Sequence, residues 1–581
     1  MNLLHLLQQK FRFTLAGMVD DPEPFVAMVK PTQDAKHGAY QANCAMSLAK
    51  VLGKKPRDIA QEIVARLALD GVLEKPEIAG PGFINLRLNP AWLAQQLQHV
   101  AKDERLGVAR AQAKKTFVID YSSPNVAKPM HVGHLRSTII GAAITRLLRF
   151  LGHAVVTDNH IGDWGTQFGM LLYGYKHFRD DAALKADPIR ELARLYLHVR
   201  SLMKADEDDE GNKVPDPVAE AARQETAKLH AGDAENLEIW EMFRPWCLEE
   251  IDRIYRRLGV TFDHTLGESF YQPMLHRVVQ DLLAKDIAQK SQDAIVVFFE
   301  EGKPPALVQK KDGAFTYTTT DLATINYRVE TWRPQAILYV VDARQALHFQ
   351  NLFTIARRWG LEEVELTHVS FGSVLGPDRR PLKTREGGAV SLEALLDEAV
   401  QRARKIVDEN SAELPEDERQ RVAEAVGIGA VKYADLSQNR TSDYVFNWDK
   451  MLAMDGNTAA YMQYAYARNR SIFRKGNEDP ARLRQTPITP FLETDHERAL
   501  AVQLLRLEET LAAAAVDYQP NIITAYLWDV AKAYSAFFQH CPVLKADTPM
   551  LRESRLLLCD LTARVLQRCL DVLGIQTVER M

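Results

Sequence analysis

The sequence lacks the features that mark secreted and membrane-spanning proteins. Its 581 residues contain only five cysteines, and these form no Cys-x-x-Cys pair. That scarcity excludes a disulfide framework and a zinc ribbon and is typical of a reducing compartment. No run of 18 consecutive apolar residues occurs, so we expect no membrane-spanning helix. Polar and basic residues interrupt the apolar stretch at 1–17, and no signal cleavage site follows it. We therefore expect a cytoplasmic protein.

An excess of basic charge is also absent. The chain has 72 Lys and Arg against 77 Asp and Glu, a formal net charge of -5. This balance excludes a protein that coats nucleic acid through bulk positive charge, so any nucleic-acid site must be a local patch. Apolar residues at 46% and charged residues at 26% are ordinary values for globular proteins and exclude a disordered or collagen-like chain. At roughly 150 residues per domain, the length predicts about three or four domains.

The spacing of apolar residues divides the chain into three parts. Residues 1–112 predict a small α+β unit, with helices at 39–52 and 59–69, a strand at 83–88 and a helix-prone connector at 101–115. Residues 113–445 predict an α/β domain. Residues 446–581 predict an all-α bundle, because strand patterns disappear from about 420 onward. The helical runs of this last part are 422–434, 458–474, 497–515, 522–538 and 551–573.

The α/β domain begins with a strand at 116–121, a helix at 132–151 and a strand at 153–158. A strand, a helix and a strand within about 40 residues form a βαβ unit, which predicts a parallel sheet. Further strand candidates lie at 294–299, 336–341 and 365–371. Residues 175–290 predict a mostly helical insertion that carries an acidic loop at 206–216.

The segment between the first strand and the next helix carries the strongest functional signal. Residues 120–138 read Asp-Tyr-Ser-Ser-Pro-Asn-Val-Ala-Lys-Pro-Met-His-Val-Gly-His-Leu-Arg-Ser-Thr. Ligands of open α/β sheets bind at this end of the strands, and the free N–H groups of a helix N-terminus suit a phosphate. His131 and His134 share one side of the first turn, and Gly133 lets a flat ligand approach the backbone. A metal site is disfavoured, because neither a His-Glu-x-x-His pattern nor a cysteine cluster lies nearby.

This segment resembles the His-Ile-Gly-His signature of class I aminoacyl-tRNA synthetases, and its flanks resemble the bacterial-type arginyl-tRNA synthetases. The resemblance continues through residues 162–169, 426–437, 461–466 and 573–581 and so covers almost the whole chain. It implies a Rossmann-type catalytic domain at 113–445, a tRNA-elbow-binding domain at 1–112 and a helical anticodon-binding domain at 446–581. It also implies that the chain joins L-arginine to tRNA(Arg) with ATP, through an arginyl-adenylate, releasing AMP and diphosphate.

The second signature of that family, a Lys-Met-Ser-Lys-Ser loop, is matched in part by residues 380–384, Arg-Pro-Leu-Lys-Thr. Activation needs no protein nucleophile, because the carboxylate of the amino acid attacks the ATP itself and the protein aligns reactants and neutralises charge. The expected catalytic residues are His131, Gly133, His134 and Lys383. The resemblance implies that ATP is also held by Lys128, Phe371, Gly372, Val374 and Arg380. Magnesium is expected to arrive with the ATP, without a dedicated protein metal site.

A guanidinium substrate calls for carboxylates and planar acceptors. Tyr317 and Asp321 are four residues apart and would share one face of a helix. The resemblance implies that Asn125 holds the substrate backbone. The full set expected to bind arginine is Asp120, Ser122, Asn125, His134, Tyr317, Asp321 and Gln345. Such a pocket would reject lysine without editing, because its buried groups would stay unpaired.

An aromatic and basic stripe marks the first long helix of the C-terminal bundle. Tyr466, Arg470 and Arg474 are spaced four apart with Arg468 beside them, a combination that suits unstacked bases and phosphates. Further candidates there are Tyr526, Trp528, Tyr534 and Phe538. The resemblance also implies tRNA contacts by Tyr40 and Asn43 in the N-terminal unit.

Three alternatives stay open. A class I synthetase of another specificity is disfavoured by Asn125 and by the pair of Tyr317 and Asp321. A non-catalytic tRNA-binding paralogue is disfavoured by the intact histidine signature and Lys383. A smaller nucleotidyltransferase with the same histidine signature is disfavoured by the long helical C-terminal part. We expect tRNA(Arg), L-arginine and ATP as partners and a monomeric protein.

Overall fold

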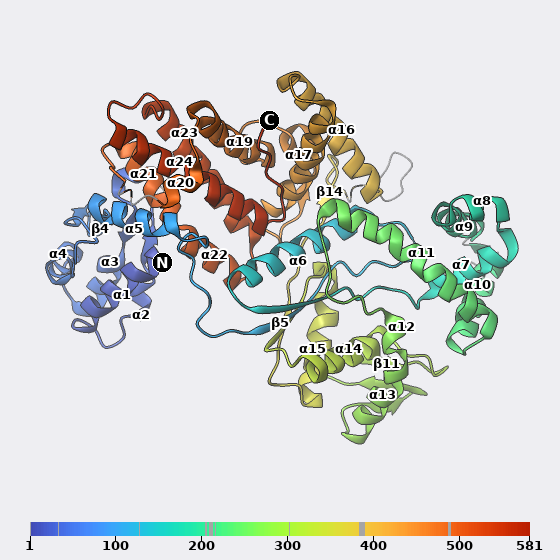
Figure 1. Cartoon of the computed structure of the whole chain (residues 1–581). Helices are drawn as coiled ribbons and strands as arrows, with labels where there is room; N and C mark the ends of the chain where they lie inside the picture. Colours follow the sequence, from blue (N-terminus) through green and yellow to red (C-terminus); the bar gives the residue numbers. More distant parts are fainter. Residues whose placement is uncertain are drawn as a thin grey trace. The chain divides into compact units, whose positions relative to one another are not determined.

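The computed structural model describes residues 2–32, 34–126, 128–203, 206–207, 213–214, 216–300, 303–380, 382, 390–485, 488 and 490–581 (Figure 1). The chain forms two compact units. The first unit comprises Met1–Ala111, Ala403–Ser437 and Asp449–Met581, and the second comprises Gln112–Arg402 and Gln438–Trp448. Within the described residues, no helix combines the length and the apolar composition needed to cross a membrane.

The second unit is built on a four-stranded parallel sheet in the order β13-β12-β5-β6. Its strands are β5 (Thr116–Asp120), β6 (Ala154–Asp158), β12 (Ala336–Tyr339) and β13 (Glu365–His368). The chain leaves β5 toward β6 on one side, whereas β12 leads to β13 on the other, so the strand order reverses between β5 and β12. Ligands of open α/β sheets bind at the carboxyl ends of the strands at such a point. The predicted βαβ unit and parallel sheet are confirmed.

Helices cover this sheet because its strands are apolar throughout, as in other parallel sheets. All four residues of β12 are buried, and Val118, Ile337 and Leu366 join one hydrophobic core with three helices. These are α13 (Leu275–Ala284), α14 (Tyr317–Trp332) and α15 (Ala346–Trp359), which lie together in Figure 1. Helix α6 (Val132–Phe150) connects β5 to β6. The sheet and its helices thus hold the start of α6 and the start of α15 beside the same sheet edge.

The strand expected at 294–299 exists but belongs to a different sheet. β10 (Ala294–Val297) pairs antiparallel with β9 (Gln289–Ser291) and β11 (Ala306–Gln309). Gln292 and Asp293 both have positive φ angles, of 49° and 63°, which is the geometry of a tight hairpin turn. A two-residue turn cannot provide the crossover that a parallel strand needs. Two further short strands, β14 (Val374–Leu375) and β15 (Tyr444–Val445), pair parallel.

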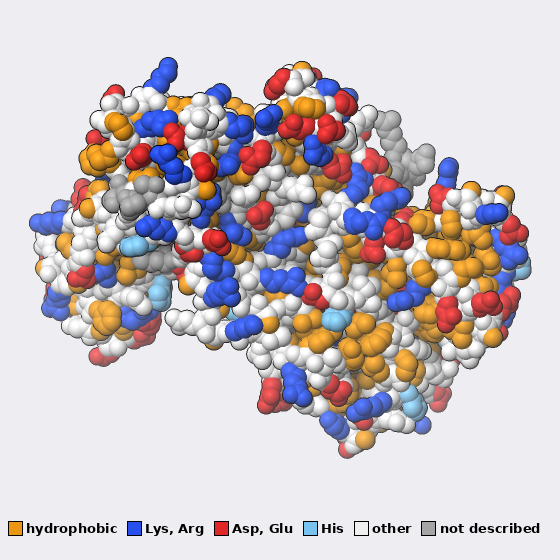
Figure 2. Space-filling model, viewed as in Figure 1, with side chains coloured by type: hydrophobic (Ala, Val, Ile, Leu, Met, Phe, Trp, Pro, Cys, Tyr) orange, Lys and Arg blue, Asp and Glu red, His pale blue; other side chains and the backbone are white. Residues whose placement is uncertain are grey.

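The insertion between β6 and β9 is mainly helical, as predicted. Its helices are α7 (Thr166–Phe178), α8 (Asp181–Ala186), α9 (Pro188–Leu202), α10 (Pro217–His230), α11 (Ala234–Leu258) and α12 (Glu268–Tyr271). The acidic loop contributes the short strands β7 (Asp206–Glu207) and β8 (Lys213–Val214). Figure 2 shows hydrophobic side chains gathered on the surface of this insertion, so part of its apolar area is not used in its own packing.

The N-terminal part of the first unit is a four-stranded antiparallel sheet with helices. The strand order is β1 (Val29–Pro31), β2 (Tyr40–Ala42), β4 (Phe83–Leu86) and β3 (Glu77–Ala79). Its helices are α1 (Leu3–Ala16), α2 (Glu23–Val26), α3 (Cys44–Leu52), α4 (Pro56–Arg66) and α5 (Pro90–Lys102). Two expectations were wrong at their edges. The helix expected to begin at residue 39 begins only at Cys44, because residues 40–42 form β2, which pairs with β1 and β4. The helix-prone connector is not helical beyond Lys102, where Asp103 accepts the N–H groups of Arg105 and Gly107 in a turn.

The C-terminal part of the first unit is the predicted helical bundle. Its helices are α17 (Glu416–Leu436), α19 (Ala459–Gly476), α20 (Pro480–Gln485), α21 (Asp495–Leu505), α22 (Leu507–Val516), α23 (Pro520–His540) and α24 (Pro549–Val572). The single run expected at 497–515 is two helices, which meet at Arg506. Helices α16 (Leu392–Asn410) and α18 (Trp448–Met451) include residues of both units.

A buried ion cluster joins α14 to the carboxyl ends of two strands. The Arg328 guanidinium lies 2.7 Å from Asp120 at the end of β5 and 2.8 Å from Asp158 at the end of β6. Arg328 and Asp158 have no exposed surface. Burial lowers the pKa of Arg328, but the two carboxylates outweigh that effect and raise it. The cluster therefore fixes α14 against the sheet at the edge where ligands bind.

We expect Arg328→Leu to destabilise the protein by about 3–5 kcal/mol, because it leaves two carboxylates buried without their counter-charge. Urea unfolding followed by intrinsic fluorescence measures this loss. Glu330→Ala, at an exposed position on the same helix, is the matched control and should change stability by less than about 0.5 kcal/mol. Equal stability of the two variants would contradict a structural role for the cluster.

Candidate functional site

Two histidines form the N-terminal cap of α6. Nδ1 of His131 accepts the N–H of Gly133 at 3.1 Å, and Nδ1 of His134 accepts the N–H of His131 at 3.1 Å. The ring centroids are 4.0 Å apart. Because a neutral imidazole has one donor and one acceptor nitrogen, each ring carries its proton on Nε2. The cap thus presents a pair of Nε2–H donors at a helix N-terminus.

Both rings are neutral near pH 7. Burial lowers the pKa of His134 to about 3, and Lys128 acts in the same direction, as does His131 whenever it is protonated. Burial and Lys128 also lower the pKa of His131. Lys128 is half-buried, and burial lowers its pKa in turn. A neutral donor pair can bind phosphate oxygens near pH 7 without changing its own charge.

Two glycines make this arrangement possible. A Cβ on Gly133 would lie 2.8 Å from Cε1 of His131, so any side chain there would displace the ring. A Cβ on Gly162 would lie 2.3 Å from Oδ1 of Asn125, whose backbone also pairs with Gly162. The structure thus places Asn125 against the segment that follows β6. Asn125 precedes the histidine cap in the sequence and lies at the same edge of the sheet.

Asp120 and Ser122 differ from their expected role. One carboxylate oxygen of Asp120 bonds Arg328, and the other accepts from the hydroxyl of Ser123 at 2.9 Å. The hydroxyl of Ser122 bonds Thr138 and Tyr255, each at 2.7 Å. Both side chains are buried. Their polar atoms are already committed to internal bonds, so we do not retain them as arginine ligands.

The opposite side of the site carries carboxylates at the start of α14. Tyr317 and Asp321 lie in its first two turns, as predicted, and Asp321 accepts from Nε2 of His348 at 2.6 Å. Gln345 is exposed and immediately precedes α15. Sequence reasoning missed a second carboxylate, Glu268 on α12. Burial raises its pKa, and the charges of Asp163 and Asp321 raise it further, so it lies within electrostatic reach of Asp321.

Glu268 lies in the same region as Tyr317 and Asp321. A Cβ on Gly165 would lie 2.8 Å from Oε1 of Gln167 and 3.9 Å from Oε2 of Glu268, so the segment after β6 approaches the Glu268 carboxylate closely. Glu268 also raises the pKa of Tyr317, after the larger effect of burial. No motif in the sequence marks Glu268, because Tyr317 and Asp321 lie on another helix, distant in the sequence. Only the folded chain brings the carboxylates of α12 and α14 together.

The segment expected to hold adenine is anchored by a residue that sequence reasoning did not select. Phe371 is buried, and its carbonyl accepts the N–H of Ala343 at 2.9 Å. The carbonyl of Gly372 accepts from Arg136 at 2.7 Å, and the Arg136 guanidinium lies 5.7 Å from the Phe371 ring. Val374 belongs to β14. Arg136 comes from α6, so one helix carries both the histidine cap and the anchor of this segment.

The second signature is only partly visible. Arg380 is exposed, and its carbonyl accepts the N–H of Gly376 at 2.8 Å. Lys383 lies outside the described residues, so its role stays a prediction. Within the part of the chain that the structure describes, no group of three or more His, Cys, Asp or Glu side chains could hold a metal ion.

The predicted stripe on α19 is largely occupied by the C-terminal tail. The Tyr466 hydroxyl donates to Glu579 at 2.8 Å, and Nε of Arg470 lies 3.3 Å from the same carboxylate. Arg474 donates to the carbonyl of Glu579 at 3.0 Å. Tyr466 is buried. These three residues therefore hold the tail and are less available to a nucleic acid than the sequence suggested.

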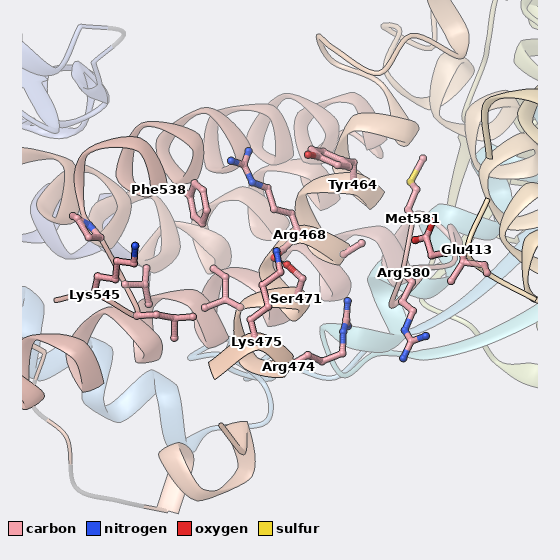
Figure 3. A pocket seen from close by; sticks show the side chains of 16 residues that line it. Glu413, Tyr464, Arg468, Ser471, Arg474, Lys475, Phe538, Lys545, Arg580 and Met581 are labelled. Carbon is pink, nitrogen blue, oxygen red and sulfur yellow. The ribbon is translucent and has the colours of Figure 1, made fainter. Parts of the chain in front are cut away.

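A pocket of about 830 Å³ lies on the neighbouring face of α19. Figure 3 shows Arg468 between Phe538 and Tyr464, with Lys475 further along the helix. The Arg468 guanidinium lies 4.1 Å from the centre of the Phe538 ring. Arginine and aromatic side chains around one pocket suit an unstacked base and its phosphate. Of the predicted stripe, Arg468 and Arg474 line this pocket.

Other residues expected to touch tRNA are placed elsewhere. Tyr40 is fully buried, and its hydroxyl donates to Glu509 of α22 at 2.7 Å. Tyr526 and Tyr534 are buried in the bundle. These three rings therefore cannot stack on a base in this conformation, and we do not retain them. Asn43 is half-buried at the start of α3.

Comparison with known proteins assigns each part of the chain. The family described as Arginyl tRNA synthetase N terminal domain matches residues 5–88. The family described as tRNA synthetases class I (R), catalytic domain, matches residues 96–448, and DALR anticodon binding domain matches residues 462–581.

Individual proteins match along the whole chain. The arginine–tRNA ligase of Salmonella arizonae is 47% identical, and that of Rhodopirellula baltica is 44% identical, each over 100% of both chains. The crystal structure of the arginyl-tRNA synthetase of Plasmodium falciparum has a TM-score of 0.83 at 27% identity, covering 100% of this chain and 99% of that one. The resemblance found in the sequence is thus confirmed, and the chain belongs to the arginyl-tRNA synthetase family.

Proposed function

We propose that the chain activates L-arginine with ATP to arginyl-adenylate and transfers the arginyl group to the 3′ end of tRNA(Arg), releasing AMP and diphosphate. The observation that carries this proposal is the arrangement at the sheet edge. A neutral pair of Nε2–H donors, on His131 and His134, begins α6, and the carboxylates of Asp321 and Glu268 lie at the start of neighbouring helices. Donors suit phosphate, and carboxylates suit a guanidinium.

In the first step the arginine carboxylate attacks the α-phosphorus of ATP, and the bond to the bridging oxygen breaks, so that diphosphate leaves. Negative charge builds on the phosphate oxygens in the transition state. The Nε2–H groups of His131 and His134 stabilise that charge, because their orientation is already fixed by the backbone bonds to Nδ1. Lys128 adds positive charge nearby, and Lys383 is proposed to close over the β- and γ-phosphates. Magnesium is proposed to bind through the phosphate oxygens.

We propose that arginine lies with its guanidinium between Asp321 and Glu268, beside Tyr317 and Gln345, and with its backbone held by Asn125 and His134. The ATP base is proposed to lie along residues 371–374, which Arg136 holds against α6. Transfer follows when a ribose hydroxyl at the tRNA 3′ end attacks the carbonyl carbon of the adenylate and AMP leaves.

The pocket of Arg468 and Phe538 on α19 is proposed to bind an unstacked tRNA base, and the N-terminal part, with Asn43, to contact tRNA elsewhere. We further propose a cytoplasmic, monomeric enzyme. The five cysteines are free and buried, which suits a reducing compartment.

Charging of total tRNA with labelled amino acids tests the proposal directly. With ATP and magnesium, we expect arginine to be attached and lysine, glutamine and cysteine to be rejected, because a substrate without a guanidinium leaves hydrogen bonds to the half-buried carboxylates unmade. Well-folded protein that binds tRNA but charges it with none of these amino acids would favour a non-catalytic tRNA-binding protein.

His134→Ala should lower kcat for aminoacylation by about a hundredfold to a thousandfold, as the loss of one transition-state donor does elsewhere. Steady-state charging kinetics measure this change. The control is His153→Ala, since His153 precedes the opposite end of β6 and should leave kcat unchanged. An unchanged kcat in His134→Ala would exclude the donor role.

Glu268→Gln should raise the KM for arginine by about tenfold or more and leave the KM for ATP unchanged, because a hydrogen bond from a charged donor to a carboxylate is lost. Glu363→Gln, at an exposed loop position, is the control. Equal arginine KM values in the two variants would remove Glu268 from the pocket.

Arg468→Ala should weaken tRNA binding by about tenfold and lower the slope of log affinity against log salt concentration by about one, because one cationic contact is lost. Filter binding over a range of salt concentrations measures both quantities. Arg498→Ala, in the same bundle but outside the pocket, is the control. The pocket assignment fails if both variants bind tRNA as tightly as the unaltered protein.

A further inference from the structure

Asp321 does not stand alone at the start of α14. Its Oδ2 lies 2.6 Å from Nε2 of His348, which belongs to the first turn of α15. Among the described residues, Asp321 has no other hydrogen bond or ion pair. Both side chains keep part of their surface exposed, 25% for Asp321 and 29% for His348. One carboxylate oxygen is thus held by the histidine, and the second oxygen stays available to a ligand.

The hydrogen bond to His348 also constrains the direction in which the Asp321 carboxylate points. A carboxylate on a helix surface can rotate about two torsions, and a short hydrogen bond to a side chain of another helix removes most of that freedom. Helices α14 and α15 pack against each other in the core of the second unit, so the distance between the backbones of Asp321 and His348 is set by that packing. His348 therefore decides how the Asp321 carboxylate faces the site.

We propose that His348 is a positioning residue for arginine recognition, which orients the Asp321 carboxylate through the hydrogen bond and, by its own protonation, sets how much negative charge Asp321 offers to the substrate guanidinium. This inference rests on the proposed function, because it takes Asp321 as a ligand of arginine.

The surroundings of His348 favour such a titration. Burial lowers the pKa of His348, but the hydrogen bond and the charge of Asp321 outweigh burial and leave the pKa above its ordinary value. The other ionisable groups that face this pair come from several elements. They are Tyr317 on α14, Glu268 on α12, Tyr339 on β12 and His368 on β13.

The expected direction follows from charge. Below the pKa of His348, an imidazolium neutralises Asp321 and competes with the guanidinium for it. Above that pKa, the neutral ring still donates its Nε2–H, and the carboxylate keeps its full charge. Because kcat/KM reports ionisations of the free enzyme, kcat/KM for arginine should rise with pH through one inflection, displaced above the pH at which an ordinary histidine titrates.

The experiment measures kcat/KM for arginine against pH, at saturating ATP and tRNA(Arg), in four forms of the full-length protein. These are the unaltered protein, His348→Gln, His348→Ala and His276→Gln. The glutamine amide keeps a donor for Asp321 but cannot titrate in this range. His276 is exposed on α13 and serves as the matched control. The KM for ATP is measured in each form as an internal reference.

We expect the inflection in the unaltered protein and in His276→Gln, and its loss in both His348 variants. At high pH, His348→Gln should keep kcat/KM for arginine within about threefold, whereas His348→Ala should lose about tenfold, since only alanine removes the hydrogen bond. The KM for ATP should not change. A residue needed only for packing would not give this rescue by glutamine.

Other outcomes separate the two hypotheses. If the unaltered protein charges arginine but His348→Gln keeps the inflection, or if His348→Ala matches the unaltered protein, the role of His348 is wrong and the proposed function stands. If no form charges arginine at any pH while the protein binds tRNA, the proposed function fails and the inference fails with it.

Discussion

The ion cluster of Arg328 with Asp120 and Asp158 is the constraint on which the second unit depends. It joins the ends of β5 and β6 to the C-terminal half of α14, with three charged groups removed from water. Buried charges are tolerated only when each has a close partner, so the positions of strand ends and helix are coupled. The strand end leads into the histidine cap of α6, and α14 carries Asp321. The buried side chain of Arg328 thus fixes the separation between two parts of the site. One is the histidine cap of α6, which is proposed to bind phosphate, and the other is Asp321, which is proposed to bind the guanidinium of the substrate.

The histidine cap of α6 and the carboxylates of Asp321 and Glu268 have opposite electrostatic properties. The phosphate side keeps His131 and His134 neutral, so a polyanionic substrate meets directed N–H dipoles whose tautomers are set by backbone bonds. The guanidinium side gathers carboxylates, and burial together with mutual repulsion raises the pKa of Glu268. A cationic substrate would relieve that repulsion. We propose that a planar guanidinium binds here in preference to the ammonium of lysine, because the guanidinium can share its hydrogen bonds between two carboxylates.

The sequence predicted the parts whose signal is local. The βαβ unit, the insertion helices and the bundle were found because apolar spacing reports the face that each element buries. The histidine cap was found because its residues are neighbours in the chain. Asp120 and Ser122 were expected to bind the substrate, but their side chains bond Arg328 and Tyr255, which lie far away in the sequence. Tyr40 and Tyr466 were expected to contact tRNA, but their hydroxyls donate to Glu509 and Glu579, which are also distant in the sequence.

The sequence by itself determined the family, the order of the domains' elements and the chemistry of the α6 cap, because these depend on short segments and on similarity along the chain. Only the tertiary structure decided which polar side chains bond to one another. Packing of distant elements brings Arg136 to Gly372, His348 to Asp321 and Arg468 to Phe538, and it pairs Asp120 with Arg328. Hydrogen bonds saturate, so an atom's availability depends on every neighbour that folding brings within reach, and no local pattern encodes that set.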